Sequence, residues 1–160
     1  MISSGDKIPS VTIKQATSEG GADVDPAQLF AGKKVVMFSL PGAFTPTCSA
    51  KHLPGYVAKL DELKAQGIDL VACLSVNDAW TMKAWAEQHD ALGKIVMLAD
   101  GSGAFTKALG IELDLEKAHM GLRCQRGVFV IEDGVVKSVD MEQPGKFDVS
   151  SAEACVMKLS

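Results

Sequence analysis

The chain has 160 residues, of which 47% are hydrophobic and 22% are charged, and its formal net charge is -4. This length predicts one domain over residues 1–160, with a substantial core, while the negative charge and the lack of a basic stripe argue against a nucleic acid or an anionic membrane as partner. No apolar run approaches the roughly 18 residues that a membrane span needs, and the N-terminus does not resemble a signal peptide.

The first third of the chain predicts two strands and a short helix. Residues 8–14 alternate between apolar and polar types, which predicts an edge strand, and the glycine pair at 20–21 predicts a turn. Asp25 followed by Pro26 is typical of an N-cap and a first helical position, so a short helix is expected up to residue 30. Residues 34–40 are apolar and β-branched and predict a buried strand.

A Pro/Gly loop over residues 41–47 joins this strand to a helix that starts near Cys48. The order strand, tight loop, cysteine, helix places a thiol in the first helical turn. Backbone N–H groups there have no intrahelical partner and the helix dipole is positive, so both features favour thiolate over thiol. The stretch therefore predicts a reactive cysteine.

The middle of the chain alternates between helices and strands. From Cys48 apolar residues recur at helical spacing, with a kink expected at Pro54 and an end at Gly67. The apolar run 68–76 fits a central parallel strand that is covered on both faces. Asn77 and Asp78 are expected to cap a helix that reaches residue 88.

The last third of the chain predicts a strand at 95–99 and a helix around 105–109, and then an irregular segment over 111–122. The Asp-Gly turn signal between two apolar runs predicts a hairpin over 128–139. Ser150 and Glu153 form a capping box for the final helix. Strands that alternate with helices, followed by a hairpin and a helix, favour an α/β fold with a central mixed β-sheet flanked by helices.

The motif around the cysteine resembles a known family. Pro41, Thr45 and Cys48 fit the peroxiredoxin pattern P-x-x-x-T/S-x-x-C, and the full stretches 41–49 and 52–55 resemble the type II (atypical) branch. Further matches occur at 5–9, at 75–78, at 98–101 and at Arg126, so the resemblance covers nearly the whole chain. It implies a thioredoxin-like fold and reduction of hydrogen peroxide and alkyl hydroperoxides, without a metal or prosthetic group.

The same resemblance implies roles for four residues. Cys48 resembles the peroxidatic cysteine, and Thr45 the residue whose hydroxyl contacts peroxide and thiolate. Pro41 resembles the residue that shields the pocket, and Arg126 the distant arginine that completes it. By sequence alone Arg126 could be a surface arginine, and Arg123 is a nearby rival.

The resemblance also implies partners. The expected reductant is glutathione with glutaredoxin, or thioredoxin. The family commonly forms a homodimer with the active-site loop near the interface, for which Phe44 and residues 79–80 are candidate contacts.

The four cysteines include no CxxC pair and show no zinc spacing with the three histidines, so reduced thiols and a cytoplasmic location are expected. Cys73 lies in the buried run 68–76 and fits a core residue, although some type II relatives use a cysteine at this spacing to resolve the sulfenate. Cys155 fits the apolar face of the last helix. Cys124 and Arg126 would share one face of an extended segment, which suggests a place at the rim of the pocket.

The segment 148–151, where some atypical relatives carry a resolving cysteine, has none. This departure favours a cycle in which an external thiol resolves the Cys48 sulfenate. His52, one helical turn after Cys48, could influence the thiolate or fill a structural hydrogen-bonding role.

Two alternative functions remain open. A nucleophile-elbow cysteine enzyme would need a tighter Gly-flanked elbow and a positioned His or Glu base, and no such elbow surrounds Cys48. A redox sensor would signal through Cys48 oxidation.

Overall fold

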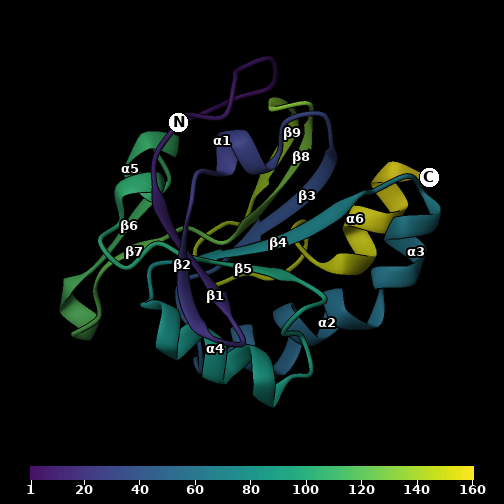
Figure 1. Cartoon of the computed structure of the whole chain (residues 1–160). Coiled ribbons are helices and arrows are strands. Elements are labelled where there is room, and N and C mark those ends of the chain that lie inside the picture. Colours follow the sequence, from purple (N-terminus) through teal and green to yellow (C-terminus); the bar gives the residue numbers. More distant parts are fainter.

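The computed structural model describes all residues from 1 to 160. Its centre is a seven-stranded sheet in the order β2-β1-β5-β4-β3-β8-β9, and a separate two-stranded hairpin pairs β6 with β7. Strands β3, β4 and β5 run parallel, and the other neighbours in the sheet pair antiparallel (Figure 1). The strands are β1 (Ile13–Thr17), β2 (Gly20–Val24), β3 (Lys34–Ser39), β4 (Leu70–Ser75), β5 (Val96–Ala99), β6 (Glu112–Leu115), β7 (Gly121–Cys124), β8 (Gly127–Glu132) and β9 (Val135–Met141).

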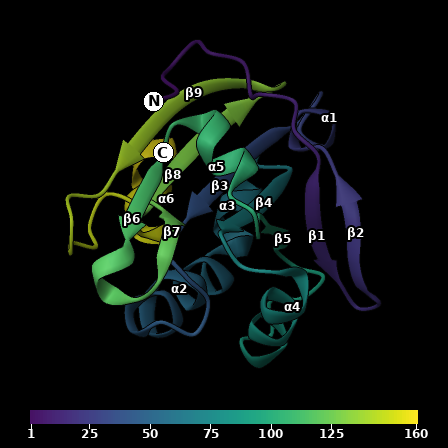
Figure 2. The same cartoon turned by 90° about the vertical axis from the view of Figure 1, so that its left-hand side faces the viewer.

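Helices cover both faces of the sheet (Figure 2). They are α1 (Pro26–Leu29), α2 (Leu53–Ala58), α3 (Leu60–Ala65), α4 (Ala79–Gln88), α5 (Ala104–Leu109) and α6 (Ala152–Leu159), with a π-helical turn η1 (Cys48–His52) and a 3-10 turn η2 (Glu116–Ala118). The buried residues of α2, α3, α4 and α6 join one core, and those of α5 join the other, against which α1 packs. The predicted α/β architecture, a mixed sheet between helices, is confirmed.

Strand β3 separates the two cores. Phe38 belongs to one core and Met37 to the other, because successive side chains of a strand point to opposite faces. Both faces of β3 and β4 are therefore apolar, as expected for central parallel strands. The C-terminal ends of these strands meet the loop that carries Cys48.

Two predictions about strands were wrong. The N-terminal strand starts at Ile13 rather than residue 8, since Pro9 cannot donate to a ladder, and it is not an edge strand, because β1 pairs with both β2 and β5. The turn lies at residues 18–19, and Gly20 opens β2. Residues 111–122 are not irregular, because they form most of the β6–β7 hairpin. In β6 the charged residues are exposed and the leucines are half-buried, a period-2 pattern over only four residues.

Helix boundaries differ at two places. The irregularity expected at Pro54 lies one turn earlier, where the Leu53 N–H donates to the Cys48 carbonyl in π-helical geometry, and a second break occurs at Lys59. The last helix is capped by Ser151 rather than Ser150, because the Ser150 hydroxyl is engaged by another residue. No helix combines the length and the apolar character needed to cross a bilayer.

Candidate active site

Cys48 lies in the first turn of a helix, as the order of elements predicts. Pro46 and Thr47 are already helical, and the Ser49 N–H donates to the Thr45 carbonyl at 2.9 Å. The thiol is fully buried. A Pro at the first helical position fits here because its missing N–H would have no partner in the helix.

Arg126, the residue just before β8, reaches the sulfur from the strand that neighbours β3. Its Nη2 donates to Cys48 Sγ at 3.0 Å. Strand β8 pairs with β3 so that Gly127 stands opposite Ser39, and this register brings the residue before β8 to the loop that follows β3. A fixed positive charge at this distance stabilises negative charge that develops at the sulfur and its reaction partner.

His52 holds the other arm of Arg126. Arg126 Nη1 lies 2.7 Å from His52 Nδ1, and His52 Nε2 lies 3.1 Å from the Ser150 carbonyl oxygen. Both contacts are hydrogen bonds only if Nε2 carries the proton and Nδ1 accepts, which defines one neutral tautomer. Burial, and then the nearby Arg126 charge, lowers the pKa of His52 to about 3, against the opposing effect of the Ser150 hydrogen bond.

Aromatic rings enclose the imidazole. The Phe38 and Phe147 rings each lie 5.0 Å from the His52 ring, and Tyr56 stacks on Phe38 at 4.1 Å. The Phe147 ring also lies 5.8 Å from the Arg126 guanidinium carbon. This apolar enclosure explains why His52 remains neutral and why Arg126 has little freedom.

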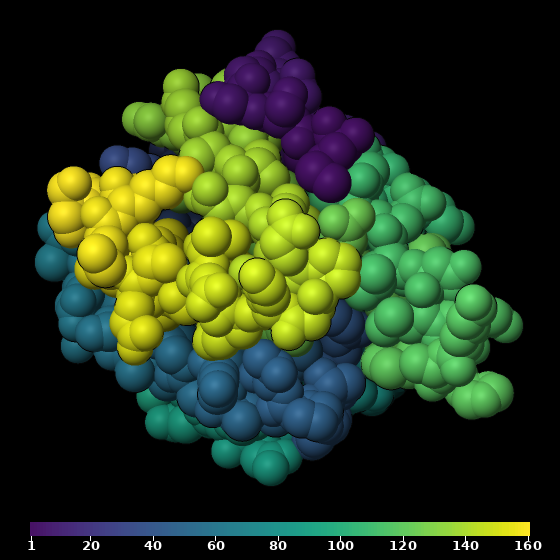
Figure 3. Space-filling view, turned by 180° about the vertical axis from the view of Figure 1, so that it is seen from behind, coloured from purple at the N-terminus to yellow at the C-terminus, as the bar shows by residue number.

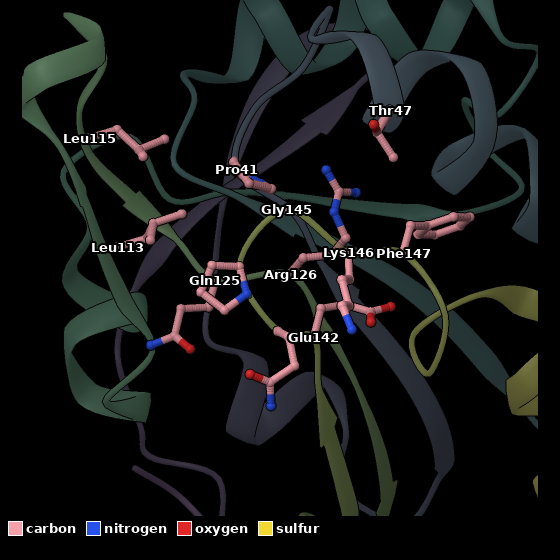
Figure 4. Close-up of a pocket in the computed structure, with 12 residues that line it drawn as sticks. Pro41, Thr47, Leu113, Leu115, Gln125, Arg126, Glu142, Gly145, Lys146 and Phe147 are labelled. Carbon is pink, nitrogen blue, oxygen red and sulfur yellow. The ribbon is translucent and has the colours of Figure 1, made fainter.

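A cavity of about 490 Å³ opens beside Arg126. Figure 4 shows Leu113 and Leu115 of β6 on one side of it and Phe147 on the other, with Arg126 between them. In Figure 3 the yellow-green chain that follows β9 lies between the green β6–β7 hairpin and the blue region of α2. The hairpin and this segment thus form opposite walls.

Of the two loop residues with predicted roles, Pro41 lies at the cavity and Thr45 is turned away from Cys48. Pro41 lines the cavity with Arg126. The Thr45 hydroxyl donates to the Gly42 carbonyl at 2.7 Å and makes no hydrogen bond to Cys48. The structure therefore brings Cys48, Arg126 and Pro41 to one place, with Thr45 turned toward its own loop.

Arg123 braces the loop instead of the thiol. Its Nη1 donates to the Val76 carbonyl at 3.2 Å and lies 3.5 Å from the Pro41 carbonyl, and its Nε donates to the Met120 carbonyl at 2.9 Å. Gly42 lies against it, since an added Cβ there would come within 3.1 Å of the Arg123 guanidinium. The rival arginine thus joins the β6–β7 hairpin to the active-site loop.

The other three cysteines are buried. Cys73 and Cys155 belong to the core that contains Cys48, and burial raises the pKa of both thiols. The idea that Cys124 lies at the rim of the pocket was wrong, because it is fully buried in the opposite core with its Sγ 3.0 Å from the Leu40 carbonyl. No group of acidic, cysteine and histidine side chains is arranged to hold a metal ion.

Several residues of the site carried little or no signal in the sequence. The structural hydrogen-bonding role weighed for His52 is present, and the same ring also holds Arg126. Glu142 and Phe147 come from the segment that follows β9, where no sequence motif marks them. The leucines of β6 were detectable only through their short alternation with charged residues.

Comparison with known proteins gives consistent results. The Redoxin family model matches residues 3–156. The chain is 47% identical over 156 residues to "Peroxiredoxin-2E, chloroplastic" of Arabidopsis thaliana, covering 95% of this chain and 67% of that protein. That relative is chloroplastic by name, and the cytoplasmic location expected for this chain stays a prediction.

Solved structures from Vibrio vulnificus show the same fold. Reduced Prx3 in complex with hydrogen peroxide is 51% identical, with a TM-score of 0.95 and full coverage of both chains. Oxidized Prx3 is also 51% identical, with a TM-score of 0.89 and 99% coverage of both chains. The expected thioredoxin-like peroxiredoxin fold is confirmed.

Proposed function

Because the chain belongs to the peroxiredoxin family, in its type II branch, and is therefore a thiol-dependent peroxidase, we propose that Cys48 is the thiol that attacks the hydroperoxide. The observation that carries this assignment is the 3.0 Å hydrogen bond from Arg126 Nη2 to Cys48 Sγ. None of the other three cysteines forms a hydrogen bond with a cationic side chain, and the Cys124 thiol contacts only backbone carbonyls.

The reaction follows from this geometry. The Cys48 thiolate attacks one peroxide oxygen, the O–O bond breaks, and the products are Cys–SOH and an alkoxide or hydroxide that takes a proton to leave as alcohol or water. Negative charge moves from sulfur to the departing oxygen, so donors fixed in advance are most effective there. Arg126, held by His52, and the backbone N–H groups of the first helical turn are such donors, and the Thr45 hydroxyl joins them by turning from the Gly42 carbonyl.

The substrates proposed are hydrogen peroxide and alkyl hydroperoxides. The cavity beside Arg126 is large enough for an organic substituent, and Leu113, Leu115 and Phe147 offer it apolar contacts. Pro41 at the cavity wall limits access of water to the sulfur. This arrangement supports a site that accepts more than the smallest peroxide.

We assign regeneration to an external thiol, either glutathione with glutaredoxin or thioredoxin. Cys73 is fully buried in the middle of β4, so a disulfide with Cys48 would require both elements to open. The segment before α6 contains no cysteine. Because Cys48 is also fully buried, the turn η1 must open before the reductant reaches the sulfenate.

A homodimer is part of the proposal. Phe44 in the active-site loop is 52% exposed, and Trp80 at the start of α4 is 74% exposed. The Ala43 N–H donates to Asn77 Oδ1 at 2.9 Å, which ties this loop to the segment that precedes α4. Two exposed aromatic residues on linked segments support an interface with a second copy.

Mass spectrometry after one equivalent of peroxide tests the proposal. With glutathione present, Cys48 is expected to carry a mixed disulfide, and without it a sulfenate. A Cys48–Cys73 disulfide in the absence of glutathione would instead assign the resolving role to Cys73.

Stopped-flow oxidation followed by steady-state turnover separates the peroxidase from a redox sensor that works through the same cysteine. A sensor would oxidise rapidly but would not turn over with either reductant. Cys48→Ser should abolish oxidation in both assays, and Cys124→Ser, which removes a thiol from the opposite core, is the matched control.

A further inference from the structure

The carboxylate of Glu142 joins the two ends of the irregular segment 142–150 through hydrogen bonds. Its Oε2 accepts hydrogen bonds from the Asp148 N–H at 2.6 Å, the Ser150 N–H at 2.9 Å and the Ser150 hydroxyl at 2.7 Å. Burial would raise the pKa of Glu142, but these hydrogen bonds, with those of Ser150 foremost, hold it below the usual range. The charged form is therefore the one that organises the segment.

The carbonyl of Ser150 is a shared acceptor in the active site. It accepts from Tyr56 Oη at 2.8 Å and from His52 Nε2 at 3.1 Å. His52 in turn accepts from Arg126, which donates to Cys48 Sγ. A continuous series of hydrogen bonds thus leads from the Glu142 carboxylate to the sulfur.

Glu142 also contacts Arg126 through its backbone. The Glu142 N–H donates to the Arg126 carbonyl at 2.9 Å. His52 fixes the guanidinium end of Arg126. The backbone N–H of Glu142, the residue whose carboxylate organises the segment, fixes its backbone end. Both ends of the arginine therefore depend on the conformation of one short segment.

We propose that Glu142 is a positioning residue for the chemistry at Cys48. Its carboxylate fixes Ser150, and the Ser150 carbonyl holds His52 in the tautomer whose Nδ1 keeps Arg126 on the sulfur. This inference rests on the proposed roles of Cys48 and Arg126, and it adds a carboxylate that touches neither of them with its side chain.

The surroundings of His52 make this dependence strong. The polar and titratable groups that face the ring are Arg126 from the β7–β8 junction, the Tyr56 ring at 5.7 Å and the Ser150 carbonyl. The remaining neighbours are aromatic, and no carboxylate hydrogen-bonds to the ring. If the Ser150 carbonyl moves, the His52 Nε2–H loses its acceptor, and the Arg126 contact at Nδ1 alone remains to hold the ring in this tautomer.

Glu142→Ala and Glu142→Gln test the proposal, with Glu132→Ala as the matched control because Glu132 is exposed at the end of β8. Stopped-flow fluorescence gives the second-order rate constant with peroxide, and Trp85 is a suitable reporter since its Nε1–H donates to Ser49 Oγ, next to Cys48. Long-range ¹H–¹⁵N spectra of the histidine rings give the His52 tautomer. Because Arg126 and His52 would gain positional freedom in Glu142→Ala, the rate constant of this variant with peroxide should fall on the order of tenfold.

The expected result combines both readouts. In Glu142→Ala the rate constant falls and the Nε2–H tautomer loses its dominance, Glu142→Gln is intermediate because an amide oxygen still accepts from the segment, and Glu132→Ala matches the wild type. An unchanged His52 spectrum overturns the proposal, whether or not the rate falls, because Glu142 would then act on the fold or the cavity alone.

If Glu142→Ala does not fold, Glu142→Gln decides by the same two measurements, and wild-type values for both overturn the proposal. The tautomer measurement does not need activity. A wild-type protein that fails to react with peroxide at Cys48 would therefore refute the proposed function and leave the test of the Glu142 clamp intact.

Discussion

The neutral state of His52 should make the stability of the fold depend on pH. The unfolded chain binds a proton on this histidine below about pH 6.5, whereas the folded chain binds it only near a pKa of about 3. The stabilisation is therefore complete above pH 6.5 and is lost as the pH falls from 6.5 toward 3. Each pH unit in this window costs about 1.4 kcal/mol, so the free energy of unfolding should fall by about 2 kcal/mol between pH 8 and pH 5 from His52 alone.

Urea unfolding of the wild type and of His52→Gln at pH 8 and pH 5 measures this effect. Glutamine stays uncharged, and its amide can donate to the Ser150 carbonyl and accept from Arg126 as the imidazole does. The variant should lose about 2 kcal/mol less than the wild type over this range. His119→Gln, at an exposed position, should not reduce the slope. Equal slopes in the wild type and His52→Gln would refute a neutral, enclosed His52.

Three further changes test the remaining parts of the site. Arg126→Lys replaces a two-armed donor by a single ammonium and should slow the reaction with hydrogen peroxide about 100-fold in stopped flow, whereas Lys137→Arg on the exposed side of β9 should leave it unchanged. Leu115→Asp should lower kcat/KM for cumene hydroperoxide about tenfold and that for hydrogen peroxide less than about twofold, and an equal loss for both would argue against an organic substituent in the cavity. Tyr56→Phe removes the 2.8 Å hydrogen bond to the Ser150 carbonyl and should lower the free energy of unfolding in urea by about 1 kcal/mol, with no change contradicting its buried geometry.

Sequence patterns predicted the central part of the fold well because burial dominates there. Strands β3 and β4 are apolar on both faces, and helix α4 is preceded by the N-cap residue Asp78, whose side chain accepts a hydrogen bond from the Thr81 N–H. Such signals lie within a few neighbouring residues, so the sequence alone reveals them. The hairpin β6–β7 was missed because each strand has only four residues, and because the two leucines of β6 face the cavity beside Arg126 rather than the core.

In the active site, too, local features could be predicted from the sequence and long-range contacts could not. The loop around Cys48 is contiguous in the sequence, so its placement in the first turn of a helix followed from local order. The partners of Arg126 depend on strand register and on a segment far along the chain, as with Ser150, which lies 98 residues from His52. No local pattern encodes that meeting, and the one-residue error at the last helix cap arose because Glu142 engages Ser150.

The choice of partner for Arg126 explains why its charge remains available to the sulfur. Arg126 forms no salt bridge, and its second arm is held by a neutral imidazole rather than a carboxylate. A carboxylate at that position would offset the positive charge that Arg126 presents to the sulfur and to the departing oxygen. In the proposed arrangement the carboxylate of Glu142 acts instead through Ser150, whose N–H and hydroxyl it binds. The site thus obtains the rigidity that an ion pair would give Arg126 while it keeps the guanidinium charge for the reacting sulfur.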